Sequence, residues 1–154
     1  MTPTRPDIES AYREACRLDV ASLKPGNVHV YANGHRMEVK DFITSADVSA
    51  PFIADPTLSV GARVRAAVEA TFAAVHCNTN LGILLLTAPL AIAAERLATK
   101  SNSPFAVTDL SAELAAVLAG LTHEDARDVY MAIAHANPAG LGNRAYCVPC
   151  ATMA

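Results

Sequence analysis

The sequence predicts an all-α protein, a single bundle of about six helices, and three observations support this fold class. Hydrophobic residues make up 52% of the 154 residues, and alanine and leucine supply much of that share, which favours helices over strands. Apolar residues recur at steps of three and four along six segments, and no segment shows a clear period-two alternation. The length is typical of one domain that buries its own core.

The first three helices are expected at residues 7–23, 38–50 and 60–76. Pro25-Gly26 ends the first, and Pro51 closes or bends the second. Arg63 and Arg65 are expected on the outer side of the third, where Arg65 can pair with Glu69 one turn later. The residues expected to face inward share helical spacing: Ile8, Tyr12, Ala15, Leu18; Val39, Phe42, Ile43, Ala46, Ala50; Val60, Val64, Val68, Thr71, Val75.

The fourth helix, expected at residues 81–99, is apolar on nearly every side, which predicts a place at the centre of the bundle. Its uncharged stretch, residues 81–94, has 14 residues, shorter than the roughly 20 that a membrane span needs. Pro89 lacks a backbone donor and clashes with the preceding turn, so a kink is expected there.

The last two helices are expected at residues 109–121 and from Thr122 onward. Thr122 with Asp125 has the spacing of a capping box, and the turn-forming residues 138–142 end the sixth helix. Residues 1–142 are therefore expected to form the helical domain, followed by an irregular tail at 143–154. The residues expected to face inward are Leu110, Leu114, Val117, Leu118 and Leu121 in the fifth helix, and Ala126, Val129, Tyr130 and Ile133 in the sixth.

Charge and cysteine content limit the function classes. The net charge is −3 and the pI is about 5.9, which does not favour binding to nucleic acid or to a membrane surface. The N-terminal residues lack the apolar segment of a signal peptide. The four cysteines are scattered and form no disulfide framework. We expect a cytoplasmic protein.

Polar residues concentrate in three places between the helices. The first is residues 22–29, where Lys24 offers a charge for a phosphate, Gly26 permits close backbone approach, and Asn27 and His29 offer a ligand or a proton shuttle. An ordinary helix C-terminus, with Lys at the negative end of the dipole and Pro-Gly in a turn, explains the same residues.

The other two clusters lie on the second helix and before the fourth. Asp41 and Ser45 are four residues apart and share one helix face, where they could hold Mg²⁺ through water or orient a sugar; a solvated face is the alternative. Residues 78–82 precede the most apolar helix, whose free N–H groups and dipole favour an anion. Ordinary capping is the alternative there. The candidate residues of this segment are Asn78, Thr79, Asn80 and Gly82.

The order of several motifs resembles the triphosphoribosyl-dephospho-CoA synthase family. These motifs are Lys24-Pro-Gly-Asn-Val-His29, Asp41-Phe42 with Ser45, Gly61, Thr71 and Asn78-Thr-Asn-Leu-Gly82. The resemblance covers about residues 8–142. Family members carry His-Lys where this chain has Asn80-Leu81, and tend to carry Asp in place of His29, so the chain resembles a divergent member whose substrate can differ. The family is about twice as long. We therefore expect an N-terminal half whose last residues come from a truncated or frame-shifted reading.

The resemblance implies transfer of the triphosphoribosyl group of ATP to the 2′-hydroxyl of dephospho-CoA, or of a related nucleotide coenzyme, with release of adenine. Lys24, Gly26, Asn27, Ser45 and residues 78–82 would then bind substrate. Asp41 would serve Mg²⁺, which arrives with ATP, or the charged sugar, and His29 the proton transfer. Two alternatives stay open: a coenzyme-binding domain without catalysis, and an inactive fragment that forms a homo-oligomer through an uncovered apolar face.

Overall fold

The computed structural model describes residues 3–23, 37–100 and 104–138. Within these ranges the chain forms an all-α bundle, as predicted, and each helix begins and ends within three residues of its expected bounds. The described helices are α1 (Arg5–Ala21), α2 (Val39–Ile53), α3 (Val60–Val75), α4 (Leu81–Lys100), α5 (Val107–Ala119) and α6 (His123–Ala136).

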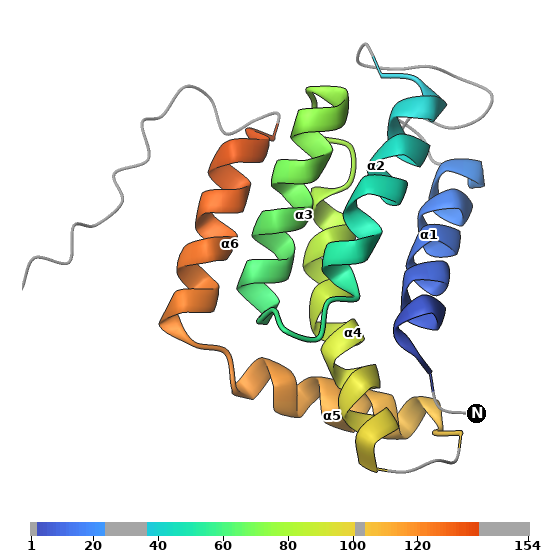
Figure 1. Cartoon of the computed structure of the whole chain (residues 1–154), viewed down its shortest axis with the longest axis vertical. Coiled ribbons are helices and arrows are strands. Elements are labelled where there is room, and N and C mark those ends of the chain that lie inside the picture. The colour runs from blue at the N-terminus through green and yellow to red at the C-terminus, as the bar shows by residue number, and fades with distance from the viewer. Residues whose placement is uncertain (1–2, 24–36, 101–103, 139–154) are drawn as a thin grey trace, which may run out of the picture.

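Four helices, α1, α2, α3 and α6, stand side by side, and α5 crosses beneath them (Figure 1). Helix α3 packs between α2 and α6, and α1 packs on the other side of α2. Helix α4 lies behind and contacts α1, α2, α3 and α5. Only 28% of its most apolar 18-residue stretch is buried, so it is less enclosed than the central place predicted for it requires. Among the described residues α4 is also long and apolar enough to cross a membrane, a test that the core helix of a bundle passes equally.

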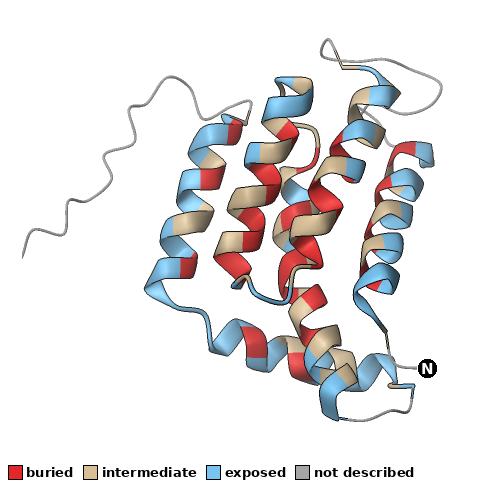
Figure 2. Ribbon diagram, in the orientation of Figure 1, coloured by how far each residue is buried: buried red, intermediate tan, exposed pale blue. Residues whose placement is uncertain are grey.

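Buried residues gather along the upright helices, whereas much of α5 and α6 is exposed (Figure 2). The best-buried core consists mostly of small residues, which allows the helices to approach one another closely. The fully buried members of this core are Ala50, Ala54, Val64, Ala67, Leu84, Ala88, Ala93 and Ala132.

An aspartate in the first turn accepts a hydrogen bond from the backbone N–H of the residue before the helix in four of the described helices. The carboxylates are Asp7, Asp41, Asp109 and Asp125, at donor–acceptor distances of 2.8, 2.8, 2.9 and 3.0 Å. A negative charge at this position also interacts favourably with the helix dipole. The predicted capping box at Thr122 is confirmed.

Beyond the first turns, two prolines lie in the interiors of the described helices. Pro51 does not close α2, contrary to one of the two outcomes expected, because the helix continues to Ile53. The Pro51 carbonyl accepts a hydrogen bond from the Arg5 guanidinium at 3.1 Å, which joins the start of α1 to the end of α2. Pro89 is buried within α4, and the kink expected there stays a prediction.

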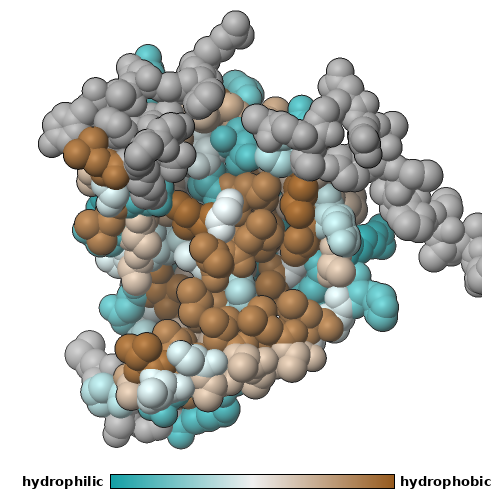
Figure 3. All heavy atoms as spheres, turned by 180° about the vertical axis from the view of Figure 1, so that it is seen from behind, coloured by the Kyte–Doolittle hydropathy of each residue, from teal (hydrophilic) through white to brown (hydrophobic). Residues whose placement is uncertain are grey.

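Several residues expected to face inward are exposed. Tyr130 is 69% exposed, and Leu118 and Leu121 are 47% and 44% exposed. Ala126 and Leu18 are exposed as well. Helix α6 instead packs on α3 through Asp125, Ala132 and Ala136. The expectation was wrong because it assumed that apolar stripes on every helix would be covered, whereas α5 and α6 each pack mainly on one neighbour. From behind, the molecule shows a broad apolar surface (Figure 3).

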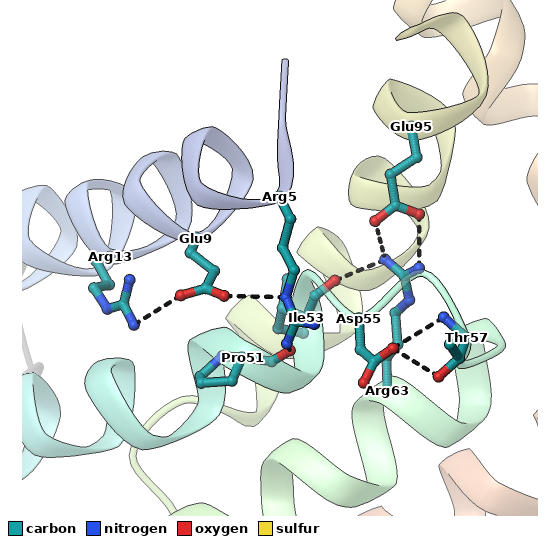
Figure 4. Close-up of polar contacts among 9 residues, drawn as sticks. All are labelled: Arg5, Glu9, Arg13, Pro51, Ile53, Asp55, Thr57, Arg63 and Glu95. Atoms are coloured by element: carbon teal, nitrogen blue, oxygen red, sulfur yellow. Dashed lines mark hydrogen bonds and ion pairs between the residues drawn. The ribbon is translucent and has the colours of Figure 1, made fainter. Parts of the chain in front are cut away.

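Arg63 is buried, not on the outer side of α3 as expected; its residue is only 1% exposed. Its guanidinium donates to the Ile53 carbonyl at 2.7 Å and binds both carboxylate oxygens of Glu95 at 3.0 and 2.7 Å (Figure 4). It also donates to the Leu58 carbonyl at 3.1 Å. Helical spacing along α3 does not predict this burial, because the hydrogen-bond partners of Arg63 lie on other elements. Arg65 does pair with Glu69, at 2.9 Å, as predicted.

The contact between α3 and α6 is unusually close at Gly61. The Gly61 N–H donates to the Asp125 carboxylate at 2.8 Å, and the same carboxylate accepts from the backbone N–H and the hydroxyl of Thr122. Burial alone would raise the pKa of Asp125, but the hydrogen bonds from Gly61, Ser59 and Thr122 outweigh it and lower the pKa to about 2.

This lowered pKa makes the α3–α6 contact sensitive to acid. Asp125 stabilises the fold fully above its unfolded pKa near 4, and this contribution is lost as the pH falls toward about 2. We therefore expect the urea midpoint of unfolding to drop between pH 5 and pH 2.5, an interval set by those two values. In Asp125→Asn the drop should be smaller, because the titrating group is gone. An equal drop in both proteins would contradict this assignment.

Candidate functional site

Hydroxyl groups from two predicted clusters meet between α2 and the turn that precedes α4. The Thr79 hydroxyl donates to Ser45 Oγ at 2.6 Å, and Ser45 Oγ donates to the backbone carbonyl of Asp41, also at 2.6 Å. Ser45 is fully buried, while Asp41 and Thr79 are half-buried. The structure thus brings the pair Asp41 and Ser45 together with residues 78–82, which follow Ser45 by more than thirty residues in the chain.

The turn before α4 presents different groups to the surface and to the interior. Asn78 caps the helix, since its side-chain oxygen accepts from the Leu81 N–H at 3.2 Å. Gly82 is exposed, and nothing lies within 4 Å of the position that a side chain would occupy there. The start of α4 is therefore open to a ligand at Gly82, on a helix end that favours an anion.

Asn80 faces the interior instead. Its residue is 6% exposed, its side-chain nitrogen donates to Tyr12 and Ser49 at 3.3 Å each, and its oxygen accepts from Thr71 at 3.4 Å. Both ends of the amide are thus used within the protein. The structure assigns Asn80 a different surrounding from that of Asn78 and Thr79, although the three residues are adjacent.

Asn80 and its three partners form a buried polar centre. The partners, Tyr12, Ser49 and Thr71, were not among the candidate site residues. Each has the spacing of a core position, and a single polar side chain on a buried face gives no pattern that points to a network. The Tyr12 hydroxyl lies 2.7 Å from Ser49 Oγ. Burial raises the pKa of Tyr12 above its ordinary value, so the phenol stays protonated and can donate.

Asp41 also lies close to the end of α3. Burial, with the Asp41 charge as a second cause, raises the pKa of the Cys77 thiol. This cysteine therefore remains a thiol near neutral pH and is not an activated nucleophile. One oxygen of the Asp41 carboxylate caps the N–H of Glu38. The charge at this end of the bundle is therefore held in place by the first turn of α2.

Lys24, Gly26, Asn27 and His29 lie outside the described residues, so their position relative to Asp41 and Thr79 stays a prediction. Residues 143–154, the predicted irregular tail, also lie outside them. In the described part of the chain, no group of three or more His, Cys, Asp and Glu residues is arranged to hold a metal ion. Asp41 supplies a single carboxylate beside the turn.

A separate groove of about 380 Å³ runs between α1 and α4. Its walls are almost entirely apolar, with Ala11 and Ala15 from α1 facing Leu90, Ala91 and Ala94 from α4. None of the candidate site residues lines it. A triphosphate needs N–H donors or cations, which these walls do not offer, so we do not place the phosphate site in this groove.

The fold and the polar centre define an all-α protein that uses side chains from several helices to fix the start of α4. A family model described as ATP:dephospho-CoA triphosphoribosyl transferase matches residues 5–153 of the chain. The chain therefore belongs to this family. The matched range extends past residue 142 and includes most of the tail. No curated protein and no solved structure showed a significant match.

Proposed function

We propose that the chain transfers the triphosphoribosyl group of ATP to the 2′-hydroxyl of dephospho-CoA or of a closely related nucleotide coenzyme. The hydroxyl oxygen bonds to C1′ of the ATP ribose, the bond from C1′ to adenine breaks, and the hydroxyl proton passes to the departing adenine. Family membership supports the reaction class. The observation that supports its location is the Thr79–Ser45 hydrogen bond, which joins the middle of α2 to the turn before α4.

The chemistry of this step explains why these groups should lie together. Positive charge develops on the ribose as the bond to adenine breaks, so a carboxylate near C1′ stabilises the transition state. Asp41 is our candidate, because the first turn of α2 holds its charge beside Thr79. The triphosphate would bind at the start of α4 near Gly82, where backbone N–H groups favour an anion.

Magnesium enters this proposal as part of the substrate. Mg²⁺ usually keeps several waters and takes one or two carboxylates together with the phosphates of its nucleotide. The single carboxylate of Asp41 fits an ion that arrives with ATP, and it does not amount to a resident metal site. Lys24 and His29 are proposed for phosphate binding and proton transfer respectively, as the family resemblance implies.

Asp41→Asn tests the role of the charge. The asparagine oxygen can still accept from the Glu38 N–H, so the cap is kept while the charge is removed. We expect adenine release from ATP and dephospho-CoA, measured by chromatography, to fall about a hundredfold. Asp109→Asn is the matched control, because Asp109 caps α5 in the same way at 2.9 Å. Similar activity in both variants would refute the assignment.

Gly82→Ala tests the phosphate site. The added methyl group meets nothing in the protein, and alanine favours a helix, so thermal stability should stay the same or rise. If phosphate oxygens approach this turn, the methyl group should weaken ATP binding by about tenfold, equivalent to about 1.4 kcal/mol. Titration calorimetry with Mg–ATP measures this. Unchanged affinity would place the triphosphate elsewhere, and binding of ATP without adenine release would favour a coenzyme-binding domain.

A further inference from the structure

The hydrogen bonds around Asn80 form one connected path through the bundle. Ser49 Oγ donates to the Ser45 carbonyl at 2.6 Å, so its single proton is used there. Tyr12 must then donate to Ser49, and both oxygens accept from the Asn80 amide. Thr71 completes the path from α3. Side chains of α1, α2 and α3 thus hold one amide directly before α4.

This path ends at the candidate site. Ser45 accepts the Ser49 proton on its backbone carbonyl and the Thr79 proton on its hydroxyl. Asn80 is bonded in sequence to Thr79 and supplies the backbone carbonyl that accepts from Leu84 in the first turn of α4. Movement of the Asn80 amide would therefore move both the Thr79 hydroxyl and the first turn of the helix.

We propose that Tyr12, Ser49 and Asn80 are positioning residues for the triphosphate site at the start of α4, and that Asn80 acts through its neighbours without touching substrate. This inference rests on the proposed function. Both N–H groups of the Asn80 amide are used by Tyr12 and Ser49, its oxygen accepts from Thr71, and the residue is only 6% exposed, so the amide faces these partners and not a ligand. Its role is to fix the turn that places Asn78, Thr79 and Gly82.

Burial makes a purely packing role for these residues a poor explanation. Tyr12, Ser49, Thr71 and Asn80 are each at most 6% exposed. Apolar side chains of the same size would fill this space without the desolvation cost that a buried polar group carries. A fully satisfied polar network, in contrast, selects one arrangement of the elements that it joins. In the described residues every buried side-chain nitrogen and oxygen has a partner, so this network is complete.

Tyr12→Phe in the full-length chain tests the inference, because it keeps the ring and removes one hydroxyl. We expect backbone amides of residues 78–84 to exchange with solvent faster. The KM for Mg–ATP should rise about tenfold or more, with kcat nearly unchanged, since a displaced turn weakens binding. Thr71→Val, which removes the hydroxyl that bonds Asn80 from α3, should change both quantities in the same direction by a smaller factor.

Two controls separate positioning from stability. Ile8→Val shortens a buried side chain one turn before Tyr12 on the same helix and removes no hydrogen bond, and Tyr130→Phe removes an exposed hydroxyl; neither should change the KM. A variant that only unfolds part of the protein lowers apparent kcat and leaves KM as it was. A lower kcat with an unchanged KM in Tyr12→Phe would overturn the inference. Unchanged hydrogen exchange of the amides of residues 78–84 would overturn it as well.

The outcome for the unaltered chain distinguishes this inference from the proposed function. If the chain binds Mg–ATP without releasing adenine, the proposed transfer fails, and the dissociation constant replaces KM as the test of positioning. If it neither binds ATP nor releases adenine, both proposals fall. If it is active and Tyr12→Phe has wild-type kinetics, the inference alone is wrong.

Discussion

Arg63→Ala should destabilise the protein by about 3–5 kcal/mol, the range measured when one partner of a buried ion pair is removed. The loss has two sources. The Glu95 carboxylate, 22% exposed, is left without its partner, and the carbonyls of Ile53 and Leu58 lose their donor. For a protein of this size the melting temperature should fall by about 10 °C. Urea unfolding monitored by circular dichroism measures the change.

A surface arginine on the same helix provides the control. Arg65, whose side chain is 39% exposed, pairs with Glu69 and Asp128, and its replacement by alanine should cost about 1 kcal/mol or less. The double variant Arg63→Leu with Glu95→Leu removes the unpaired charge and leaves the two carbonyls unsatisfied. It should recover part of the stability, and the remaining deficit measures the carbonyl contacts. Equal effects of Arg63→Ala and Arg65→Ala would contradict the structural role of Arg63.

Arg63 also marks the limit of what the sequence predicts about the fold. Helix number, order and bounds follow from apolar spacing and from turn-forming residues, which act locally. Which face is covered depends on packing between helices. Tyr130 continues the apolar stripe of α6 but remains exposed, because α6 approaches α3 along a neighbouring face. Leu118 on α5 remains exposed because α5 packs mainly on α4. Rules based on neighbouring residues predict that Arg63 lies on the surface, because its partner Glu95 is 32 residues away in the chain.

The candidate site shows the same division. The sequence predicts that polar residues on the second helix and before the fourth belong together, and the Thr79–Ser45 hydrogen bond places them in contact. It does not predict that Asn80 faces inward, because three adjacent polar residues look alike until one of them is matched to Tyr12 and Thr71. A single tyrosine, serine or threonine at a core position carries no sign of its partners on other helices.

The close approach of α3 and α6 at Gly61 should make Gly61→Ala strongly destabilising. A methyl group at Gly61 would lie 2.5 Å from the backbone Cα and carbonyl oxygen of Asp125, so α3 and α6 would have to separate. Separation also weakens the Gly61–Asp125 hydrogen bond. Overpacking of this kind costs about 3 kcal/mol, and backbone atoms cannot move aside as a flexible side chain can.

The effect of Gly61→Ala should concentrate in α6, because α6 packs mainly on α3. We expect amides of residues 123–136 to lose protection from hydrogen exchange while those of α2 and α4 keep theirs, as for a unit that opens separately. Gly82→Ala is the control, since the same change in open space should be neutral or stabilising. Uniform loss of protection over all helices would mean that α6 is an integral part of one cooperative core. Unchanged protection would show that the two helices do not approach as closely as the Gly61–Asp125 contact implies.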